Sequence, residues 1–181
     1  MIKSLYTIVE NSIIAPKTYK MILAGEGAVE GEFVNIAVPG YYLRRPLSVC
    51  DWEDGRLTIV YKVVGEGTKV LSKMPVGASL EVLTGLGRGF DPDGCRKEAL
   101  LVGGGLGVPP LLLLAKKLKA QGKKVSAVLG FNKAGEIILE KEFRGVCDEV
   151  VISTVDGSVG VKGFVTDAIK AAEPSFDYFY T

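Results

Sequence analysis

Two arginines and a serine stand close together in the segment Arg44-Arg45-Pro46-Leu47-Ser48. We expect this segment to open a strand, and an arginine at the end of a strand can hold a phosphate through two parallel N–H donors. Because side chains alternate along a strand, Ser48 lies on the same face as Pro46, where its hydroxyl can hydrogen-bond a ring nitrogen or oxygen. Exposed arginines at strand ends are common, so the segment taken alone favours ordinary surface residues.

A second group of the same kind is Gly65-Glu66-Gly67-Thr68, between a predicted strand and a predicted short helix over 68–73. Free backbone N–H groups at a helix start, together with the Thr68 hydroxyl, predict a second anion site. A turn with Thr68 as helix cap is the alternative, and it is the better interpretation of this segment alone. The first half of the chain thus contains two candidate phosphate-binding segments, and an α/β domain of the dinucleotide-binding type follows them. This combination favours cofactor binding over a purely structural role.

A glycine-rich turn follows the apolar residues 99–102 and precedes a predicted helix. Its glycines let the backbone approach a pyrophosphate, and the helix start adds free N–H groups. The segment lacks the Gly-Lys-Ser/Thr ending of a P-loop and is not a regular G-x-G-x-x-G, so it favours a dinucleotide over kinase-type chemistry. A tight structural turn is the alternative. The glycines concerned are Gly103, Gly104, Gly105 and Gly107.

Composition excludes several classes of function. Lys and Arg total 22 against 21 Asp and Glu, so we expect no nucleic-acid partner and no binding to an anionic membrane. The N-terminal residues alternate like a strand, and the most apolar later run, 108–115, is far shorter than the roughly 20 residues of a membrane span. These features predict a cytoplasmic protein with no membrane partner.

Histidine is absent, which removes the Ser-His and Cys-His nucleophile systems. Hydride or electron transfer by a cofactor remains possible, because the cofactor carries the reactive atoms. Cys50, Cys95 and Cys147 are widely separated and form no C-x-x-C pair, which predicts reduced thiols and no metal or iron–sulfur site from neighbouring residues. We expect no catalytic side chain and no metal ligand on this chain.

The two halves of the chain have different patterns of apolar residues. The first half predicts six strands in a small antiparallel barrel, and the second half alternates strands with helices, as in a parallel α/β sheet. We place the boundary within 91–98, which gives domains 1–95 and 96–181. The expected barrel strands are 3–9, 19–24, 33–38, 46–51, 56–63 and 79–83. The later strands are 99–102, 125–131, 150–154 and 178–181, with helices over 109–120 and 165–172.

These motifs, in this order along nearly the whole chain, resemble the ferredoxin reductase superfamily. Within it they are most similar to the family of dihydroorotate dehydrogenase B electron-transfer subunits. The resemblance implies an FAD-binding barrel over 1–95 and an NAD-binding α/β domain over 96–181. The segments that carry it are Leu43–Ser48, Tyr61–Thr68, Gly85–Phe90, Asp156–Ser158 and Lys162–Asp167.

The resemblance also implies a role for individual residues. Arg45 would pair with the FAD pyrophosphate, Ser48 would face the flavin near N5, and the glycine-rich turn would hold the NAD pyrophosphate. The residues expected to contact FAD are Arg45, Pro46, Leu47, Ser48, Val60, Tyr61, Lys62, Gly67 and Thr68. Those expected to contact NAD are Gly103, Gly104, Gly105, Gly107, Asp156, Gly157 and Ser158.

In this family, NADH reduces FAD, and FAD passes electrons through a [2Fe-2S] cluster to an FMN-containing catalytic subunit that oxidises dihydroorotate in pyrimidine biosynthesis. The implied partner is that catalytic subunit, in a heterotetramer. Relatives continue past the final strand with a Cys-Gly-Pro turn and four clustered cysteines, whereas this sequence stops at Tyr178–Thr181. We therefore expect an incomplete α/β domain, and a [2Fe-2S] cluster only in a longer natural chain.

Other interpretations of the sequence stay open. The chain could be the flavin subunit of a related ferredoxin:NADP reductase or sulfide dehydrogenase, or a nucleotide sensor without redox chemistry. Asn132-Lys133 follows the strand over 125–131, where an acidic residue would typically bind a ribose 2′-hydroxyl, so the choice between NADH and NADPH is undecided. Val159 and Val161 make the loop after Ser158 more apolar than is usual in relatives.

Overall fold

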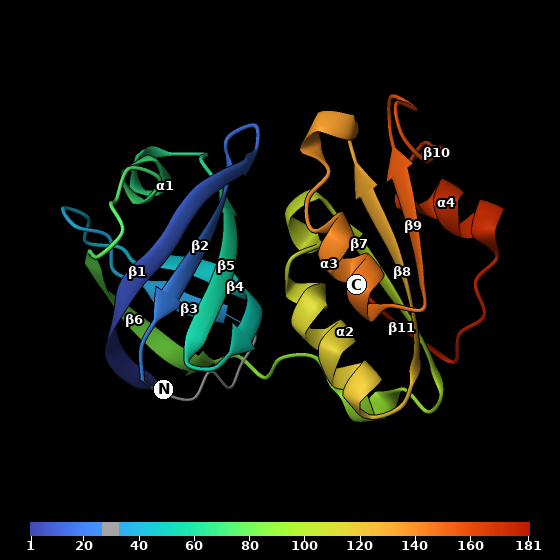
Figure 1. The fold of residues 1–181 in the computed structure, drawn as a ribbon, viewed down its shortest axis with the longest axis horizontal. Helices are drawn as coiled ribbons and strands as arrows, with labels where there is room; N and C mark the ends of the chain where they lie inside the picture. Colours follow the sequence, from blue (N-terminus) through green and yellow to red (C-terminus); the bar gives the residue numbers. More distant parts are fainter. Residues whose placement is uncertain (27–32) are drawn as a thin grey trace. The chain divides into compact units, whose positions relative to one another are not determined.

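The computed structural model describes residues 1–26 and 33–181. The chain divides into two compact units, Met1–Gly89 and Phe90–Thr181. Figure 1 shows the first as a barrel and the second as a sheet with flanking helices, which confirms the predicted fold class. Among the described residues, no helix has the length and apolar character needed to cross a membrane.

Residues 90–95, expected in the first domain, pack with the second unit. The Phe90 ring lies edge-on to the Tyr180 ring, with 6.1 Å between the ring centroids. The Tyr180 hydroxyl donates to the Asp91 carbonyl at 2.9 Å. These contacts fix the start of the second unit to its last strand.

The barrel is closed, so none of its strands is an edge. All neighbouring strands are antiparallel, in the order β1-β2-β5-β4-β3-β6. The six predicted barrel strands are confirmed, and β1 runs beyond the predicted end at Val9 because its second half pairs with β2 as far as Ala15. The strands are β1 (Ile2–Ala15), β2 (Thr18–Ala24), β3 (Phe33–Ile36), β4 (Arg45–Glu53), β5 (Arg56–Lys62) and β6 (Ser79–Leu86).

Alternating apolar residues of these strands form the barrel core. On β5, for example, Leu57 and Ile59 are fully buried while Thr58 between them is only partly buried. The same alternation brings buried side chains from the other strands into one interior. The largest of them are Tyr6, Ile8, Met21, Leu23, Ile36 and Leu80.

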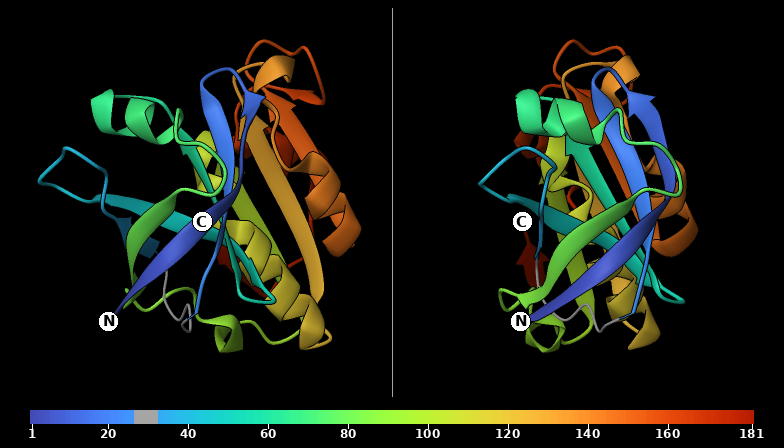
Figure 2. Two further views of the ribbon diagram at one scale, coloured as in Figure 1. Left: turned by 60° about the vertical axis from the view of Figure 1, so that its left-hand side comes forward. Right: turned by 90° about the vertical axis from the view of Figure 1, so that its left-hand side faces the viewer.

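Helix α1 (Glu66–Leu71) lies at one end of the barrel, beside the loop before β4 (Figure 2). It begins at Glu66 rather than at the predicted Thr68, because the extended backbone of Gly65 serves as its N-cap. The Asn11 side-chain amide donates to the carbonyls of Leu71 and Met74, at 2.9 and 3.1 Å. These bonds join the end of α1 to β1.

The second unit contains a five-stranded parallel sheet in the order β10-β9-β8-β7-β11. The chain steps outward from β7 to β10 and then returns to place β11 on the other side of β7, so the strand order reverses at β7. Ligands of such sheets bind outside the carboxyl ends of the strands near this reversal. The strands are β7 (Glu98–Gly104), β8 (Lys124–Phe131), β9 (Glu149–Thr154), β10 (Val161–Lys162) and β11 (Tyr178–Tyr180).

Helices cover both faces of this sheet, with α2 (Pro110–Ala120) and α3 (Glu140–Val146) on one face and α4 (Val165–Ala172) on the other (Figure 1). On the α4 side, Leu100 and Val102 of β7 pack with Ala168. Short 3-10 turns are η1 (Pro92–Gly94), η2 (Gly105–Gly107) and η3 (Ala134–Glu136).

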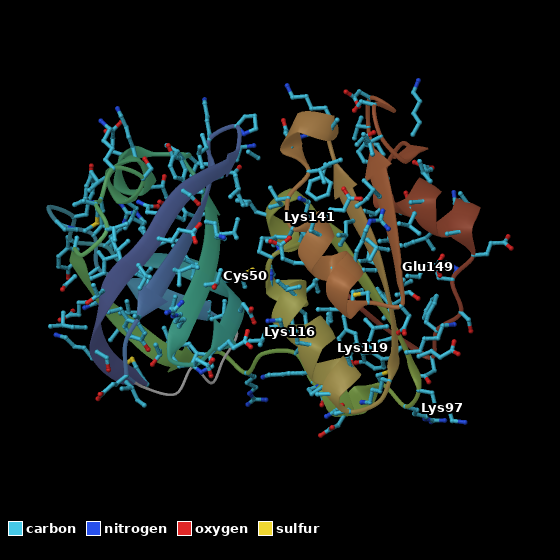
Figure 3. The ribbon with its side chains drawn as sticks, in the orientation of Figure 1. Cys50, Lys97, Lys116, Lys119, Lys141 and Glu149 are labelled. Carbon is cyan, nitrogen blue, oxygen red and sulfur yellow. The ribbon has the colours of Figure 1, made fainter. Side chains whose placement is uncertain are left out.

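Polar contacts fix the amino ends of the sheet strands. Lys119 of α2 donates to both carboxylate oxygens of Asp148, at 2.8 and 2.9 Å, just before β9 begins at Glu149. Lys119 and Glu149 are labelled in Figure 3. The Asp177 carboxylate accepts the backbone N–H groups of Arg96, Lys97 and Glu98, at 3.0, 2.7 and 3.1 Å. These bonds, led by the one from Arg96, lower the pKa of Asp177 to about 2.

Candidate functional site

The structure brings Arg45 of β4 onto the first turn of α1. A Cβ atom added to Gly67 would stand 2.7 Å from the Arg45 Cζ atom, so only glycine leaves room for the guanidinium at this position. Arg45 also donates to the Leu43 carbonyl at 2.5 Å, and its Cζ lies 5.2 Å from the centroid of the Tyr41 ring. In the described part of the chain no carboxylate pairs with Arg45, so its charge is available to an anion.

Arg44 has a different role from its neighbour. Its guanidinium pairs with the Glu81 carboxylate of β6 and donates to the Glu81 carbonyl at 3.4 Å. Lys3 lies 2.6 Å from the other Glu81 carboxylate oxygen. Hydrogen bonds from Lys3 and Arg44 lower the pKa of Glu81. The two adjacent arginines therefore have different roles: Arg44 joins segments of the barrel, and Arg45 is left for a ligand.

The Thr68 hydroxyl holds the turn that starts α1. It accepts the N–H groups of Val64 and Gly65, at 3.0 and 3.2 Å, and donates to the Gly65 carbonyl at 2.9 Å. These three bonds use the one donor and both acceptor positions of a hydroxyl. The N–H groups of Glu66, Gly67 and Thr68 stand in the first turn, where a helix has no acceptor of its own for them.

Ser48 and Val60 point away from the barrel core. The register of β4 and β5 pairs Val49 with Ile59, and both of these side chains are buried in the core. Because side chains alternate, Ser48 and Val60 occupy the opposite face of the two strands. Ser48 keeps partial exposure there, whereas Val60 is 6% exposed. Two further residues of β4 were predicted to contact FAD, and of these Pro46 is exposed and Leu47 is half-buried.

Tyr61 differs from the other predicted flavin contacts because its side chain lies inside the barrel. It is 1% exposed, its ring stacks on Tyr19 at 5.7 Å between centroids, and its hydroxyl donates to Asn11 Oδ1 at 2.9 Å. Burial raises the pKa of its hydroxyl above the ordinary value. The structure therefore does not bring the Tyr61 ring to a ligand-accessible surface, while Lys62 beside it is half-buried.

The predicted glycine-rich turn joins β7 to α2 through η2, and its glycines fall into two groups. At Gly103 an added Cβ would stand 2.8 Å from Leu111 Cδ1 and 3.1 Å from the Gly107 carbonyl oxygen, so this glycine allows the helix to pack on the strand. Gly105, with φ +54°, and Gly107 would place a Cβ in open space. Gly104 is exposed and also unobstructed, its nearest neighbour being the Gly130 carbonyl oxygen at 4.0 Å.

A pocket of about 210 Å³ lies at the carboxyl ends of β7, β8 and β9, entirely within the second unit. Gly104 and Gly105 form one part of it, and Phe131, Val155 and Phe164 supply apolar walls. The pocket thus joins the glycine-rich turn to the ends of the neighbouring strands, near the point where the strand order reverses.

Glu136, which was not among the predicted site residues, also lines this pocket. The η3 turn carries it back toward the end of β8, where its Oε2 atom accepts the side-chain amide of Asn132 at 2.9 Å. Directly after the strand, where an acidic residue was expected, the sequence has Asn132-Lys133. The sequence does contain an acidic residue a few positions later in the same polar loop, and this residue could have been used to predict Glu136 as part of the site.

Asp156, Gly157 and Ser158 form a turn tied to η3. The Asp156 carboxylate accepts the backbone N–H and the hydroxyl of Ser158, at 2.9 and 2.6 Å, and these bonds lower its pKa. The Ser158 hydroxyl oxygen accepts the Ala134 N–H at 2.8 Å. This turn therefore lies at the same edge of the sheet, although Val155 rather than Asp156 lines the pocket.

Comparison with known proteins identifies the family. The sequence is 44% identical over 190 residues to the dihydroorotate dehydrogenase B (NAD(+)) electron transfer subunit of Fusobacterium nucleatum, covering 97% of this chain and 73% of that protein. It is 41% identical to the subunit of the same name from Streptococcus thermophilus, with 97% of this chain and 71% of that protein covered. The chain belongs to the family of dihydroorotate dehydrogenase B electron transfer subunits.

Solved structures share the predicted fold. The fold matches a chain from the structure of NADH-dependent reduced ferredoxin-NADP oxidoreductase with a TM-score of 0.79 and 32% identity, covering 94% of this chain and 63% of that chain. A cytochrome P450 reductase from Amycolatopsis shares the fold, with a TM-score of 0.83 at 24% identity over 98% of this chain and 60% of that chain. No protein-family model matches the sequence.

Proposed function

We propose that this chain is an FAD-containing electron-transfer subunit that takes electrons from a reduced nicotinamide dinucleotide. It would pass them to an FMN-containing dihydroorotate dehydrogenase catalytic subunit in pyrimidine biosynthesis, within a heterotetramer. The observation that carries the proposal is the uncompensated Arg45 guanidinium packed on Gly67 at the start of α1, in a chain of this family. A positive charge and free N–H groups at one point are what a pyrophosphate requires.

The barrel unit offers groups that fit FAD. Arg45 and the backbone N–H groups of Gly67 and Thr68 would hold the pyrophosphate. Ser48 and Val60, on one outward face of β4 and β5, would lie against the flavin ring, and Ser48 would donate a hydrogen bond to it. Pro46, Leu47 and Lys62 flank this face, and Tyr61 would act from within the barrel by fixing β5.

The second unit offers groups that fit a nicotinamide dinucleotide. The backbone of Gly104, Gly105 and Gly107 is open to solvent and would hold a pyrophosphate, while Gly103 sets the close approach of α2 that forms the turn. The turn Asp156–Ser158 would lie near the nicotinamide half. The pocket at the strand ends would take another part of the same molecule.

Bound FAD supplies the change from two-electron to one-electron transfer, so the chain itself needs no acid or base. The absence of histidine from the sequence is consistent with a chain that needs no side-chain acid or base. A [2Fe-2S] cluster would lead electrons onward from FAD. Within residues 1–26 and 33–181 no group of three or more His, Cys, Asp or Glu side chains could hold a metal ion. The role of this chain's residues is to bind and orient the cofactors.

The proposal is tested by titrating the full chain with FAD and following flavin fluorescence and absorbance. We expect Arg45→Ala to weaken FAD binding by about 10- to 100-fold, because a hydrogen bond to a charged group contributes about 1.5–3 kcal/mol. Arg44→Ala is the matched control and should leave FAD affinity unchanged, since Arg44 pairs with Glu81. An unchanged affinity in Arg45→Ala, or a wild-type chain that binds no FAD, would refute the proposal.

A further inference from the structure

The side-chain amide of Asn11 forms hydrogen bonds at both of its ends. Its Nδ2 atom donates to the carbonyls of Leu71 and Met74, at 2.9 and 3.1 Å, and its Oδ1 atom accepts the Tyr61 hydroxyl at 2.9 Å. Carbonyl oxygens only accept, so the amide nitrogen must face α1 and the amide oxygen must face Tyr61. Asn11 therefore connects the end of α1 to β5, although 60 residues separate it from Leu71 and 50 from Tyr61.

An irregularity in β1 directs Asn11 toward these partners. Tyr6 and Ile8 are buried in the barrel, so the even-numbered positions of this part of β1 face inward. The pairing of β1 with β2 then shifts by one residue between Ile8 and Glu10. An extra residue of this kind changes the direction of the side chains that follow it. Asn11 consequently faces inward at an odd-numbered position, where it meets the buried Tyr61 hydroxyl.

Helix α1 needs support from outside itself. It has six residues, and a helix of this length is not stable alone in water. Its first turn carries the N–H groups of Gly67 and Thr68 that we propose for the FAD pyrophosphate. The carbonyls at the end of a helix have no donor within it, and Asn11 supplies donors to Leu71 and to Met74 just beyond it. Loss of these bonds would release the end of α1 and let its first turn move.

Tyr61 connects the same amide to the strand proposed to face the flavin. It follows Val60, which lies on the outward face of β5, whereas the Tyr61 ring is 1% exposed and stacks on Tyr19 inside the barrel. The ring therefore holds its hydroxyl in a fixed position. One amide thus joins the strand beside the proposed flavin ring to the helix beside the proposed pyrophosphate.

We propose that Asn11 is a positioning residue of the FAD site, which fixes α1 and β5 relative to each other so that one cofactor can contact both. The inference rests on the proposed function, because it takes FAD as the ligand of both segments. Asn11 acts through α1 and Tyr61 rather than by contact with FAD. Its loss should therefore weaken FAD binding in a barrel that remains folded.

The first test titrates the full chain with FAD and follows flavin fluorescence. Asn11→Asp keeps an acceptor for Tyr61 and removes both donors to α1, so we expect FAD binding to weaken by about tenfold. Tyr61→Phe keeps the ring on Tyr19 and removes only the hydroxyl, so we expect a loss of about threefold. Ser12→Ala is the matched control, because Ser12 is the next residue of β1 and hydrogen-bonds Glu10 instead.

The second test separates positioning of α1 from general stability. The backbone N–H groups of Lys69 and Ser72 form hydrogen bonds within α1, both at 3.0 Å. Without FAD, their hydrogen exchange should be faster in Asn11→Asp than in the wild type, while exchange in β5 stays the same. In an Arg45→Ala background, Asn11→Asp should cost less FAD affinity than it does alone, because both changes affect the same site.

The outcomes distinguish this inference from the proposed function. If Arg45→Ala weakens FAD binding but Asn11→Asp and Tyr61→Phe bind FAD as tightly as the wild type, the inference is wrong and the proposed function stands. The inference is also wrong if Asn11→Asp leaves exchange in α1 unchanged and costs the same affinity with and without Arg45. If the wild type binds no FAD, the proposed function is wrong and the inference with it.

Discussion

The two candidate ligand sites are built in different ways. In the barrel unit, the anion site depends on Arg45 and Gly67, which are brought together only when β4 and α1 take their places at one end of the closed barrel. In the α/β unit, the corresponding site is a continuous stretch of backbone over Gly103–Gly107. The first site is therefore a product of tertiary folding and a side-chain charge, and the second is a product of local backbone conformation.

Glycine has two separate functions in this comparison. Gly67 and Gly103 are required because a neighbouring side chain or helix occupies the space of a Cβ. Gly65 and Gly107 stand in open space, where a methyl group meets no atom of the protein. Each site thus contains one glycine that serves packing and one that leaves its surroundings clear, and alanine substitutions at the four positions separate the two functions.

The largest expected effect is at Gly103. Gly103→Ala places a methyl group against Leu111 and the backbone of Gly107 and Val108, which should destabilise the protein by about 1–3 kcal/mol. Gly107→Ala should leave stability nearly unchanged, because the added methyl group meets no atom of the protein. It should instead weaken dinucleotide binding, because the methyl group enters the space proposed for the pyrophosphate. Denaturant unfolding and an NADH titration of the two variants measure both effects. Equal stability of the two variants would remove the distinction between them.

The next effect is at the barrel site. Gly67→Ala forces the Arg45 guanidinium from its position and should weaken FAD binding by about tenfold, a loss of about 1.4 kcal/mol. Gly65→Ala is its control, since Gly65 has an extended φ of −164° that any residue adopts. Fluorescence titration with FAD compares the two variants. If both bind FAD as tightly as the wild type, Arg45 does not hold the cofactor from the observed position.

A smaller, pH-dependent effect concerns the second unit alone. The pKa of Asp177 is lowered to about 2 by the three backbone N–H groups that it accepts, so its contribution to stability is present above its ordinary pKa of about 4 and is lost as pH falls toward 2. Asp177→Asn should lower the Tm at pH 7, and the difference from the wild type should shrink between about pH 4 and about pH 2.

Thermal unfolding of the wild type and Asp177→Asn across this pH range measures that difference. The control is Glu142→Gln, which changes an exposed carboxylate on α3 and should show no such pH dependence. A difference in Tm that stays constant down to pH 2 would show that the Asp177 charge does not hold β11 beside β7.

The sequence predicts most of the fold because its apolar residues recur with the periods of strands in the first half and of strands and helices in the second. Leu57, Ile59 and Tyr61 mark β5 as a half-buried strand, and the helix predicted over 165–172 agrees with α4. Helix α3 was not predicted, since Phe143 is the one buried residue among its seven and leaves no helical pattern. The far half of β1 was missed for a similar reason, because polar Asn11 and Ser12 interrupt its alternation.

The site was predicted less completely, because residue type does not fix what a side chain faces. The sequence marks Arg45 and Thr68 alike as ligand groups, but the Thr68 hydroxyl is used within its own turn. Tyr61 was expected beside the flavin and lies inside the barrel. Glu136 was overlooked because only the η3 turn brings it back to Asn132 at the strand end.

The most direct measurement is the anaerobic addition of NADH to the FAD-loaded full chain, followed by flavin absorbance. If the barrel holds FAD through Arg45 and the α/β unit holds the dinucleotide on its glycine-rich turn, NADH will bleach the flavin absorbance, with a rate that saturates as NADH is raised. A chain that holds FAD and binds NADH but keeps its full flavin absorbance would contradict the account.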